Sequence, residues 1–288
     1  TPLRLRLTEG YKELPAVEAV LYLDKKGRIV QPPLNPYSPV AFYPTATDKV
    51  PRLYRQWAVT SGLLAEEFAR RGVKGAVALP PEVTDVRQWQ WRGFVGEVRY
   101  TFYLDLPHEI EAVDHSERNK VNKAGRGGFS CEIAPKDAYT EVVACLAETE
   151  ARQGFSHRLS TKDLEVALDL LGADIFRVYV CRDGSSEVAC ARIVISAPGL
   201  RAVDWVAGTK TRFLRSGCTQ FLIWYVLNDL AHQGAAGFDF AGANLPTVSA
   251  AKADWGGTLA PYYAVRPLNL RTLGGWLLKA LGQARKRG

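Results

Sequence analysis

The stretch GFDFAGANLPTVSAAKADWGGTLAPYY, residues 237–263, decides the fold prediction for this chain. It begins as a short strand in which one aspartate stands between two phenylalanines. Because side chains alternate along a strand, Phe238 and Phe240 should share one face and Asp239 should lie on the other. The segment therefore predicts a buried strand that presents a single acid.

A short helix and a second strand follow this acid. Pro246 suits the first turn of a helix, since proline lacks the N–H that would stay unpaired there. The helix carries Lys252 and ends in Trp-Gly-Gly, where glycine permits a left-handed stop. The returning strand contains Tyr262 and Tyr263. Together these elements form a compact unit that can build a site.

The composition is that of a globular protein with a sizeable core. Of the 288 residues, 47% are hydrophobic and 23% are charged, and the length allows one large domain or two of ordinary size. The formal net charge of +7 favours an anionic partner such as nucleic acid, nucleotide phosphates or a membrane surface. A basic protein without such a partner fits the charge equally well.

The five cysteines and four histidines are scattered and show no metal-ligand spacing. We therefore expect no metal site and no disulfide framework, and reduced thiols are typical of a cytoplasmic protein. The longest run of bulky apolar residues, 221–227, is too short to span a bilayer, so no integral membrane segment is expected. The sequence leaves the oligomeric state open.

In the first half, residues 51–71 predict an amphipathic helix, and residues 73–79 predict a strand. The loop at 80–94 that follows is dense in groups that bind ligands, including Arg87 and Trp91. Such a loop either packs over its own domain or lines a cleft. A strand at 99–106 then leaves this half, and Pro107 marks the expected boundary.

The second half opens on its most basic segment, residues 116–127. Ser116 can cap a helix there, and Arg118 and Lys123 would project from that helix. Neighbouring glycines would let backbone N–H groups reach an anion. The segment is either a phosphate-binding patch or a solvated helix face.

The rest of the second half predicts a layered α/β domain. Two helices are expected at 136–153 and 161–171, and three strands follow at 175–182, 187–196 and 202–207. A nearly apolar helix at 216–233 then precedes the strand that holds Asp239. A helix that is apolar all round should be buried.

Several segments together resemble the FemAB-like transferases of the GNAT superfamily of N-acyltransferases. The D-V-R at 85–87 with Trp91 is similar to one block of that family. S-x-R-x-x-x-x-K-A at 116–124, F-D-F-x-G at 238–242 and K-x-x-W-G-G at 252–257 are similar to three more. Each motif alone is weak, but their order and spacing match over most of the chain.

The resemblance implies an α/β (α+β) fold of two GNAT-like units that face each other across a cleft. Each unit would be a mixed, mostly antiparallel sheet flanked by helices. The expected division is 1–108 for the first unit and 109–266 for the second, with a basic amphipathic helix at 267–288. That helix either packs on its own protein or touches RNA or a membrane.

The resemblance also implies transfer of an acyl or aminoacyl group to an amine. Many relatives take the group from aminoacyl-tRNA and build peptidoglycan cross-bridges or antibiotic amides, and others use acyl-CoA. The CoA-type pattern Q/R-x-x-G-x-G/A aligns with residues 212–217, where Arg212 and Gly217 fit but Arg215 replaces the first glycine. A side chain at that position should crowd a pyrophosphate at the helix N-terminus. Aminoacyl-tRNA is therefore the expected partner, acyl-CoA is the alternative co-substrate, and no other cofactor is expected.

Three residues are the expected catalytic groups. Lys252 stands where the family carries a lysine that stabilises the tetrahedral intermediate. Asp239 would orient the amine or act as base, and the phenol of Tyr262 would serve a leaving oxygen. The alternative readings are a surface lysine, an acid that accepts from backbone donors, and a core tyrosine.

Further residues are expected to bind substrates. Arg87 and Trp91 would contact the amine acceptor, a small molecule or a peptide or cell-wall precursor. Tyr263 would bind substrate and, like Tyr262, could offer its phenol to a leaving oxygen. Arg118 and Lys123 would contact a phosphate or an RNA end, and the three residues of the CoA-type pattern would contact the donor. Internal salt bridges and packing are the alternatives. A non-catalytic binding module with the same fold is the third functional hypothesis.

Overall fold

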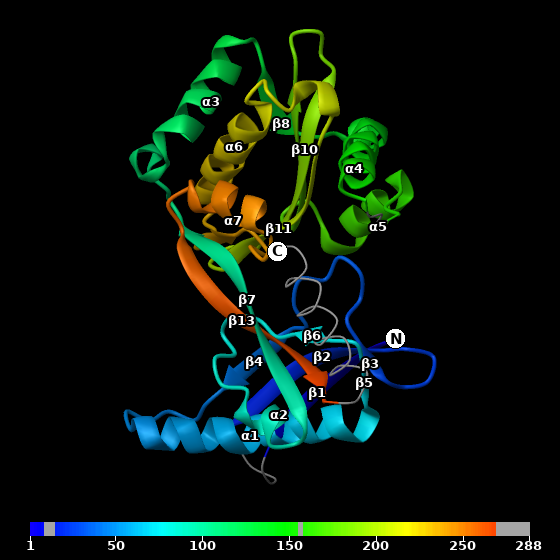
Figure 1. Ribbon diagram of the computed structural model, residues 1–288, viewed down its shortest axis with the longest axis vertical. Helices are drawn as coiled ribbons and strands as arrows, with labels where there is room; N and C mark the ends of the chain where they lie inside the picture. Colours follow the sequence, from blue (N-terminus) through cyan, green and yellow to red (C-terminus); the bar gives the residue numbers. More distant parts are fainter. Residues whose placement is uncertain (9–14, 155–157, 269–288) are drawn as a thin grey trace, which may run out of the picture. The chain divides into compact units, whose positions relative to one another are not determined.

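The computed structural model describes residues 1–8, 15–154 and 158–268. These residues form two compact units, one built from residues 1–99 and the segment that begins at 261, the other from residues 100–260. The strands β7 (Phe94–Asp105) and β13 (Thr258–Pro267) carry the chain between them (Figure 1). The compact units thus divide within β7 and β13, whereas the sequence placed its boundaries near Pro107 and after residue 266. The predicted helix at 267–288 lies almost wholly outside the described residues.

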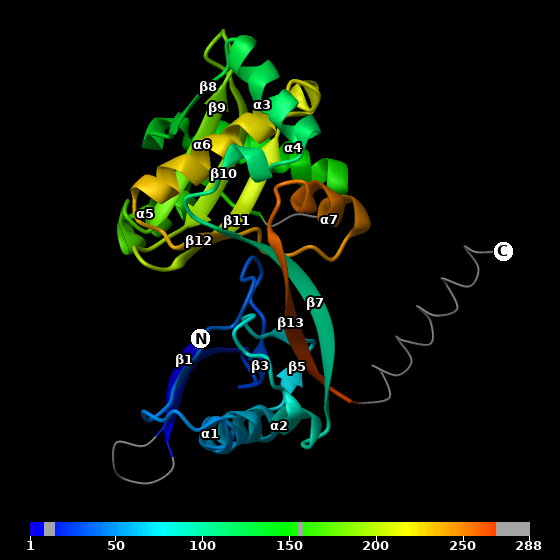
Figure 2. The ribbon, with the colours of Figure 1, turned by 90° about the vertical axis from the view of Figure 1, so that its left-hand side faces the viewer.

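The first unit contains a mixed sheet in the order β1-β2-β3-β5, with β4 also paired to β2. Among the strand pairs of this sheet in the described residues, β3 and β5 are the parallel pair. The strands are β1 (Pro2–Thr8), β2 (Ala16–Leu23), β3 (Ile29–Val30), β4 (Val40–Tyr43) and β5 (Val73–Lys74). The helix α1 (Val50–Arg71) runs along one side of this sheet (Figures 1 and 2).

The core of the first unit lies between α1 and the sheet. Leu64 and Phe68 of α1 are fully buried in the same cluster as Leu21 of β2. Trp89, from the short helix α2 (Arg87–Gln90), is also fully buried and meets the Phe68 ring edge-on at 5.8 Å. The strand β6 (Val77–Ala78) pairs with β13 in this unit.

The second unit is built on a sheet in the order β7-β12-β11-β10-β9-β8. Its strands are β8 (Ser130–Ile133), β9 (Phe176–Arg182), β10 (Val188–Ile195), β11 (Arg201–Thr209) and β12 (Gly237–Asp239). In the described part of this unit, β11 and β12 pair in parallel, whereas the pair of β12 with β7 and the successive pairs from β11 to β8 are antiparallel. The predicted fold class, mixed α/β with two mixed sheets flanked by helices, is confirmed, whereas the predicted cleft stays a prediction.

Helices cover both faces of this second sheet. The helices α3 (His115–Arg126) and α6 (Cys218–His232) lie on one face, and α4 (Tyr139–Gln153) and α5 (Thr161–Leu171) lie on the other (Figure 1). Short 3-10 turns stand at Ile110–Ala112, Lys136–Ala138 and Thr211–Phe213. One face of α6 is buried, with Leu222, Val226 and Leu230 at most 1% exposed, whereas Asn228 on another face is exposed. The helix is therefore buried on one side and not all round as its composition predicts.

The strands β11 and β12 diverge, and this divergence positions the site. They pair only from Arg201 to Val203, opposite residues 237–239. Beyond that point β11 continues to Thr209, while the other chain turns away through Gly242, where φ is +112°, into α7 (Pro246–Ala253). The space that opens between the two strands is bordered by α7 and α4.

No helix in the described ranges is long and apolar enough to cross a membrane.

Candidate functional site

Lys252 is held at the start of this divergence by two backbone carbonyls. Its Nζ donates to the carbonyl oxygens of Phe240 and Gly242, each at 2.6 Å. Burial lowers the pKa of Lys252 below its usual value, and the nearby Asp204 carboxylate offsets part of that shift. An ammonium has three donors, so the Lys252 side chain is fixed in place and retains one N–H for a further acceptor.

Asp239 shapes the turn that supplies those two carbonyls. Its side chain is 2% exposed and accepts from the Thr101 hydroxyl at 2.5 Å and from the Ala241 N–H at 2.8 Å. The same Thr101 oxygen accepts the Gly242 N–H at 3.0 Å. Asp239 therefore holds in place the turn whose carbonyls bind Lys252, and its predicted role toward the amine stays a prediction.

A cavity of about 380 Å³ lies beside Lys252 within the second unit. The helices α4 and α7, the strand β11 and the turn after β12 form its wall. The lining residues are Leu146, Thr149, Glu150 and Gln153 of α4, Trp205, Val206 and Ala207 of β11, and Ala241, Gly242, Asn244, Leu245, Val248 and Lys252. This volume falls within the usual range of small-molecule sites.

A buried ion pair accompanies the cavity, and the sequence analysis missed it. Arg192 of β10 and Asp204 of β11 bond to each other with side chains 7% and 9% exposed. Both influence the pKa of Lys252 through their charge. Arg192 interrupts an otherwise apolar β10, and Asp204 interrupts the apolar run at 202–207 in β11, which is the signal that could have identified them.

The basic helix α3 brings together several of the residues predicted to bind phosphate or donor. Lys123 Nζ donates to the carbonyl oxygen of Arg215 at 2.9 Å. Arg118 has a buried Nε without a hydrogen-bond partner among the described residues. The helix is capped by Asp114, which accepts the Ser116 N–H at 2.7 Å, so the predicted cap at Ser116 is wrong by two residues.

The segment aligned with the CoA-type pattern is packed against its neighbours. A Cβ at Gly217, where φ is +90°, would lie 2.3 Å from the Lys120 carbonyl oxygen of α3. Arg212 pairs with Glu187 and lies 4.7 Å from the centre of the Phe213 ring. Close helix packing is thus a sufficient reason for glycine at 217, and donor binding by this segment stays a prediction.

In the first unit, Arg87 and Tyr263 line a second cavity of about 380 Å³, together with Tyr54, Thr84, Asp85, Val86 and Gln90. Arg87 pairs with Asp85 at 2.8 Å, which lowers the pKa of that carboxyl. Trp91 is 68% exposed, with the Arg87 guanidinium 5.8 Å from its ring centre. The structure therefore places Arg87 and Trp91, both predicted to contact the acceptor, beside each other, and Tyr263, predicted to bind substrate, at the same cavity as Arg87.

Tyr262 lies apart from that cavity's lining. Its ring is buried and packs edge-on against Tyr37, with the ring centres 5.1 Å apart. The alternative reading of Tyr262 as a core tyrosine thus matches its surroundings, and its catalytic role stays a prediction.

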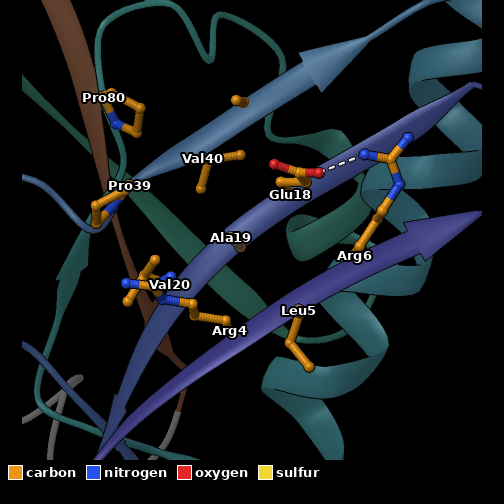
Figure 3. Close-up of a pocket in the computed structure, with 10 residues that line it drawn as sticks. Arg4, Leu5, Arg6, Glu18, Ala19, Val20, Pro39, Val40 and Pro80 are labelled. Carbon is orange, nitrogen blue, oxygen red and sulfur yellow. Dashed lines mark hydrogen bonds and ion pairs between the residues drawn. The ribbon is translucent and has the colours of Figure 1, made fainter.

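A wider cavity of about 600 Å³ lies over β1, β2 and β4 in the first unit (Figure 3). Arg6 and Glu18 form an ion pair in its wall, and Val20, Pro39 and Pro80 supply apolar surface. Its lining contains none of the predicted site residues, and no lysine in that lining is held by two backbone carbonyls as Lys252 is. We therefore take the cavity beside Lys252 as the candidate active site.

Among the described residues, no group of three His, Cys, Asp or Glu side chains could hold a metal ion.

Comparison with known proteins agrees with the predicted fold. Residues 114–247 match the family model described as Acetyltransferase (GNAT) domain. A crystal structure of FemX has a TM-score of 0.63 at 13% identity, covering 94% of this chain and 89% of that one. No curated protein matches.

Two further solved structures have similar coverage. The C-terminal domain (DUF2156) of a putative lysylphosphatidylglycerol synthetase from Agrobacterium fabrum has a TM-score of 0.61 at 12% identity, covering 92% of this chain and 85% of that one. L-PGS from Bacillus licheniformis has a TM-score of 0.58 at 12% identity, covering 94% and 86%. At such identities the likeness concerns the fold.

Proposed function

We propose that this chain is a FemAB-like protein of the GNAT superfamily that transfers an acyl or aminoacyl group from an activated donor to an amine. The match of residues 114–247 to a GNAT domain and the similarity of the fold to that of FemX support this proposal. The observation that carries the proposal is Lys252, fixed by two carbonyls in the wall of a cavity where parallel strands diverge. We favour an aminoacyl donor.

The reaction requires one new C–N bond and the loss of one bond to the donor. The amine attacks the donor carbonyl carbon, and the carbonyl electrons move onto oxygen. Collapse of this intermediate reforms C=O and expels the donor's ester oxygen, which takes the proton that the amine loses. The remaining N–H of Lys252 would bind the transient oxyanion, which is the charge that a preorganised donor stabilises best.

The environment of Lys252 suits this role. Its lowered pKa makes the ammonium a more acidic donor than an exposed lysine. Asp239 and Thr101 hold the turn whose carbonyls aim it, so these two residues would act by positioning Lys252. Contact of Arg87 and Trp91 with the acceptor stays a separate proposal.

Aminoacyl-tRNA is the donor we favour. The formal net charge is +7, and Arg215 stands where a CoA-binding loop would place glycine. One structural neighbour is a putative lysylphosphatidylglycerol synthetase, whose named product carries an aminoacyl group. The matched family model is described as an acetyltransferase domain, so acyl-CoA is the second candidate donor.

A donor screen tests the proposal. The protein is given total charged tRNA or a panel of acyl-CoAs with a mixture of amine acceptors, and mass spectrometry identifies any amide product. Lys252→Met should lower turnover by about 10²-fold to 10³-fold, the usual effect of removing one oxyanion donor. Lys136→Met, at an exposed lysine paired with Asp169, is the matched control and should leave turnover unchanged.

Three results would contradict the proposal. Unchanged turnover in Lys252→Met would remove the assigned role of this lysine. An RNase-insensitive product that requires acyl-CoA would replace the favoured donor with the alternative. Ligand binding without turnover from any donor would identify a binding module of the same fold.

A further inference from the structure

Glu150 gives the candidate active site a second charge. Among the described residues that line the cavity, Glu150 is the acid and Lys252 is the base. The side chains at 146, 149, 150 and 153 share one face of α4, because residues three and four apart are neighbours on a helix. Glu150 is therefore presented to the cavity by the helix itself.

The helix backbone next to Glu150 is held in place through Thr149. The Thr149 hydroxyl accepts the Thr209 N–H at 2.9 Å and lies 3.2 Å from the Thr209 carbonyl oxygen, to which it can donate. Arg152 donates to the Thr211 hydroxyl at 3.1 Å. These bonds join the last turn of α4 to the end of β11, so the cavity wall that contains Glu150 is held against the sheet.

Because Glu150 is buried, we expect it to favour ligands that carry a positive charge. Its residue is 8% exposed, and removing a carboxylate from water is costly unless it is paired or hydrogen-bonded. Glu150 already interacts elsewhere in the protein, but a carboxylate offers about four acceptor positions and can bind a further donor. A cationic ligand group in the cavity would add a favourable charge-assisted bond.

The cavity thus suits a group that has both a carbonyl oxygen and an ammonium. Lys252 offers a donor to the oxygen, and Glu150 offers an acceptor to the ammonium. Trp205, which also lines the cavity, adds an aromatic surface of the kind that cations favour. An aminoacyl group has both functions, whereas an acetyl group has only the carbonyl.

We propose that Glu150 binds the free ammonium of the transferred aminoacyl group and thereby selects aminoacyl donors over simple acyl donors. This inference rests on the proposed function and names the substrate class of the same site. A donor whose amino group is acetylated would lack the ammonium that adds the charge-assisted bond to this carboxylate. The ratio of the binding affinities for the free-amine donor and the acetylated donor therefore reports the contribution of Glu150.

Binding of a stable donor mimic tests this without any acceptor. The probes are 3′-alanylamino-3′-deoxyadenosine and its N-acetyl derivative, whose amide linkage does not transfer. Calorimetry on the full chain should show the free amine form binding about 10-fold to 100-fold more tightly, as expected for a hydrogen bond to a charged group. Glu150→Gln should reduce that ratio to about 3-fold or less.

Glu148→Gln is the matched control. Glu148 lies on the same helix but is exposed and accepts the Thr211 N–H outside the cavity lining, so its removal should leave the discrimination intact. Full discrimination in Glu150→Gln would overturn the inference, and so would equal binding of both probes, or binding of neither, in the unmodified chain. Discrimination by the unmodified chain without turnover from any donor would instead refute the proposed function alone.

Discussion

Replacing Gly217 with alanine should destabilise the second unit more than the same change at Gly234. Both glycines have left-handed backbones, with φ of +90° and +77°, and they flank the same helix, α6. An added Cβ at Gly217 would lie 2.3 Å from the Lys120 carbonyl oxygen, whereas nothing lies within 4 Å of one at Gly234. The pair therefore separates backbone strain from the clash with α3.

The expected loss of stability is the sum of the backbone strain and the clash. A left-handed alanine costs about 1–2 kcal/mol at either site. The clash with a backbone oxygen requires a shift of α3 or α6, and overpacking of this kind costs about 1–3 kcal/mol more. We expect the free energy of unfolding to fall by about 1–2 kcal/mol in Gly234→Ala and by about 2–5 kcal/mol in Gly217→Ala.

Urea unfolding followed by circular dichroism measures the difference. With a slope of about 2 kcal/mol per M, an extra 2 kcal/mol lowers the midpoint by about 1 M. Equal midpoints for the two variants would refute the packing explanation. If Gly217→Ala instead kept full stability but lost donor binding, then approach of a ligand would be the reason for this glycine.

Two further predictions concern charged pairs. Arg192→Met should lower the free energy of unfolding by about 3–5 kcal/mol, because it leaves the buried Asp204 carboxylate without its ion-pair partner. The double variant Arg192→Met with Asp204→Leu should regain part of this stability, as measured by denaturant unfolding. The side-chain hydrogen bond from Arg28 is the main cause that lowers the pKa of Asp24 from 3.8 to about 2. Because the folded pKa is the lower one, this stabilisation is complete above about pH 4 and is lost as the pH falls toward 2. Stability of Asp24→Asn should therefore fall less steeply than that of the unmodified chain over this range, and parallel curves would contradict the assignment.

Periodicity was enough to predict most elements of the second unit. The strands β9 to β12 and the helices α4 to α6 were predicted to within a few residues, because their apolar patterns reflect burial in one unit. The strand β8 was not predicted. The loop at 80–94 was harder, because composition does not tell a packed tryptophan from an exposed one. A single helical turn there buries Trp89 completely and leaves Trp91 68% exposed.

The candidate site was only partly predictable. Lys252 and Asp239 belong to one local motif, so the sequence placed them together. Glu150 follows Glu148 in a polar helix end that resembles a solvated face, and only the divergence of β11 from β12 brings it to the cavity. The cysteines show the same limit, since Cys131 and Cys190, scattered in the sequence, both stand opposite Cys181 on neighbouring strands.

The passage of β13 back into the first unit limits how this protein can be dissected. Val265 and Ala264 of β13 pair with Val77 and Ala78 of β6, and both β13 residues are fully buried. A fragment that stops at residue 108 would lack this strand and expose the surface it covers. Expression trials of the first unit should therefore append residues 258–268 through a flexible linker, or circularly permute the chain so that β13 and β6 stay on one polypeptide.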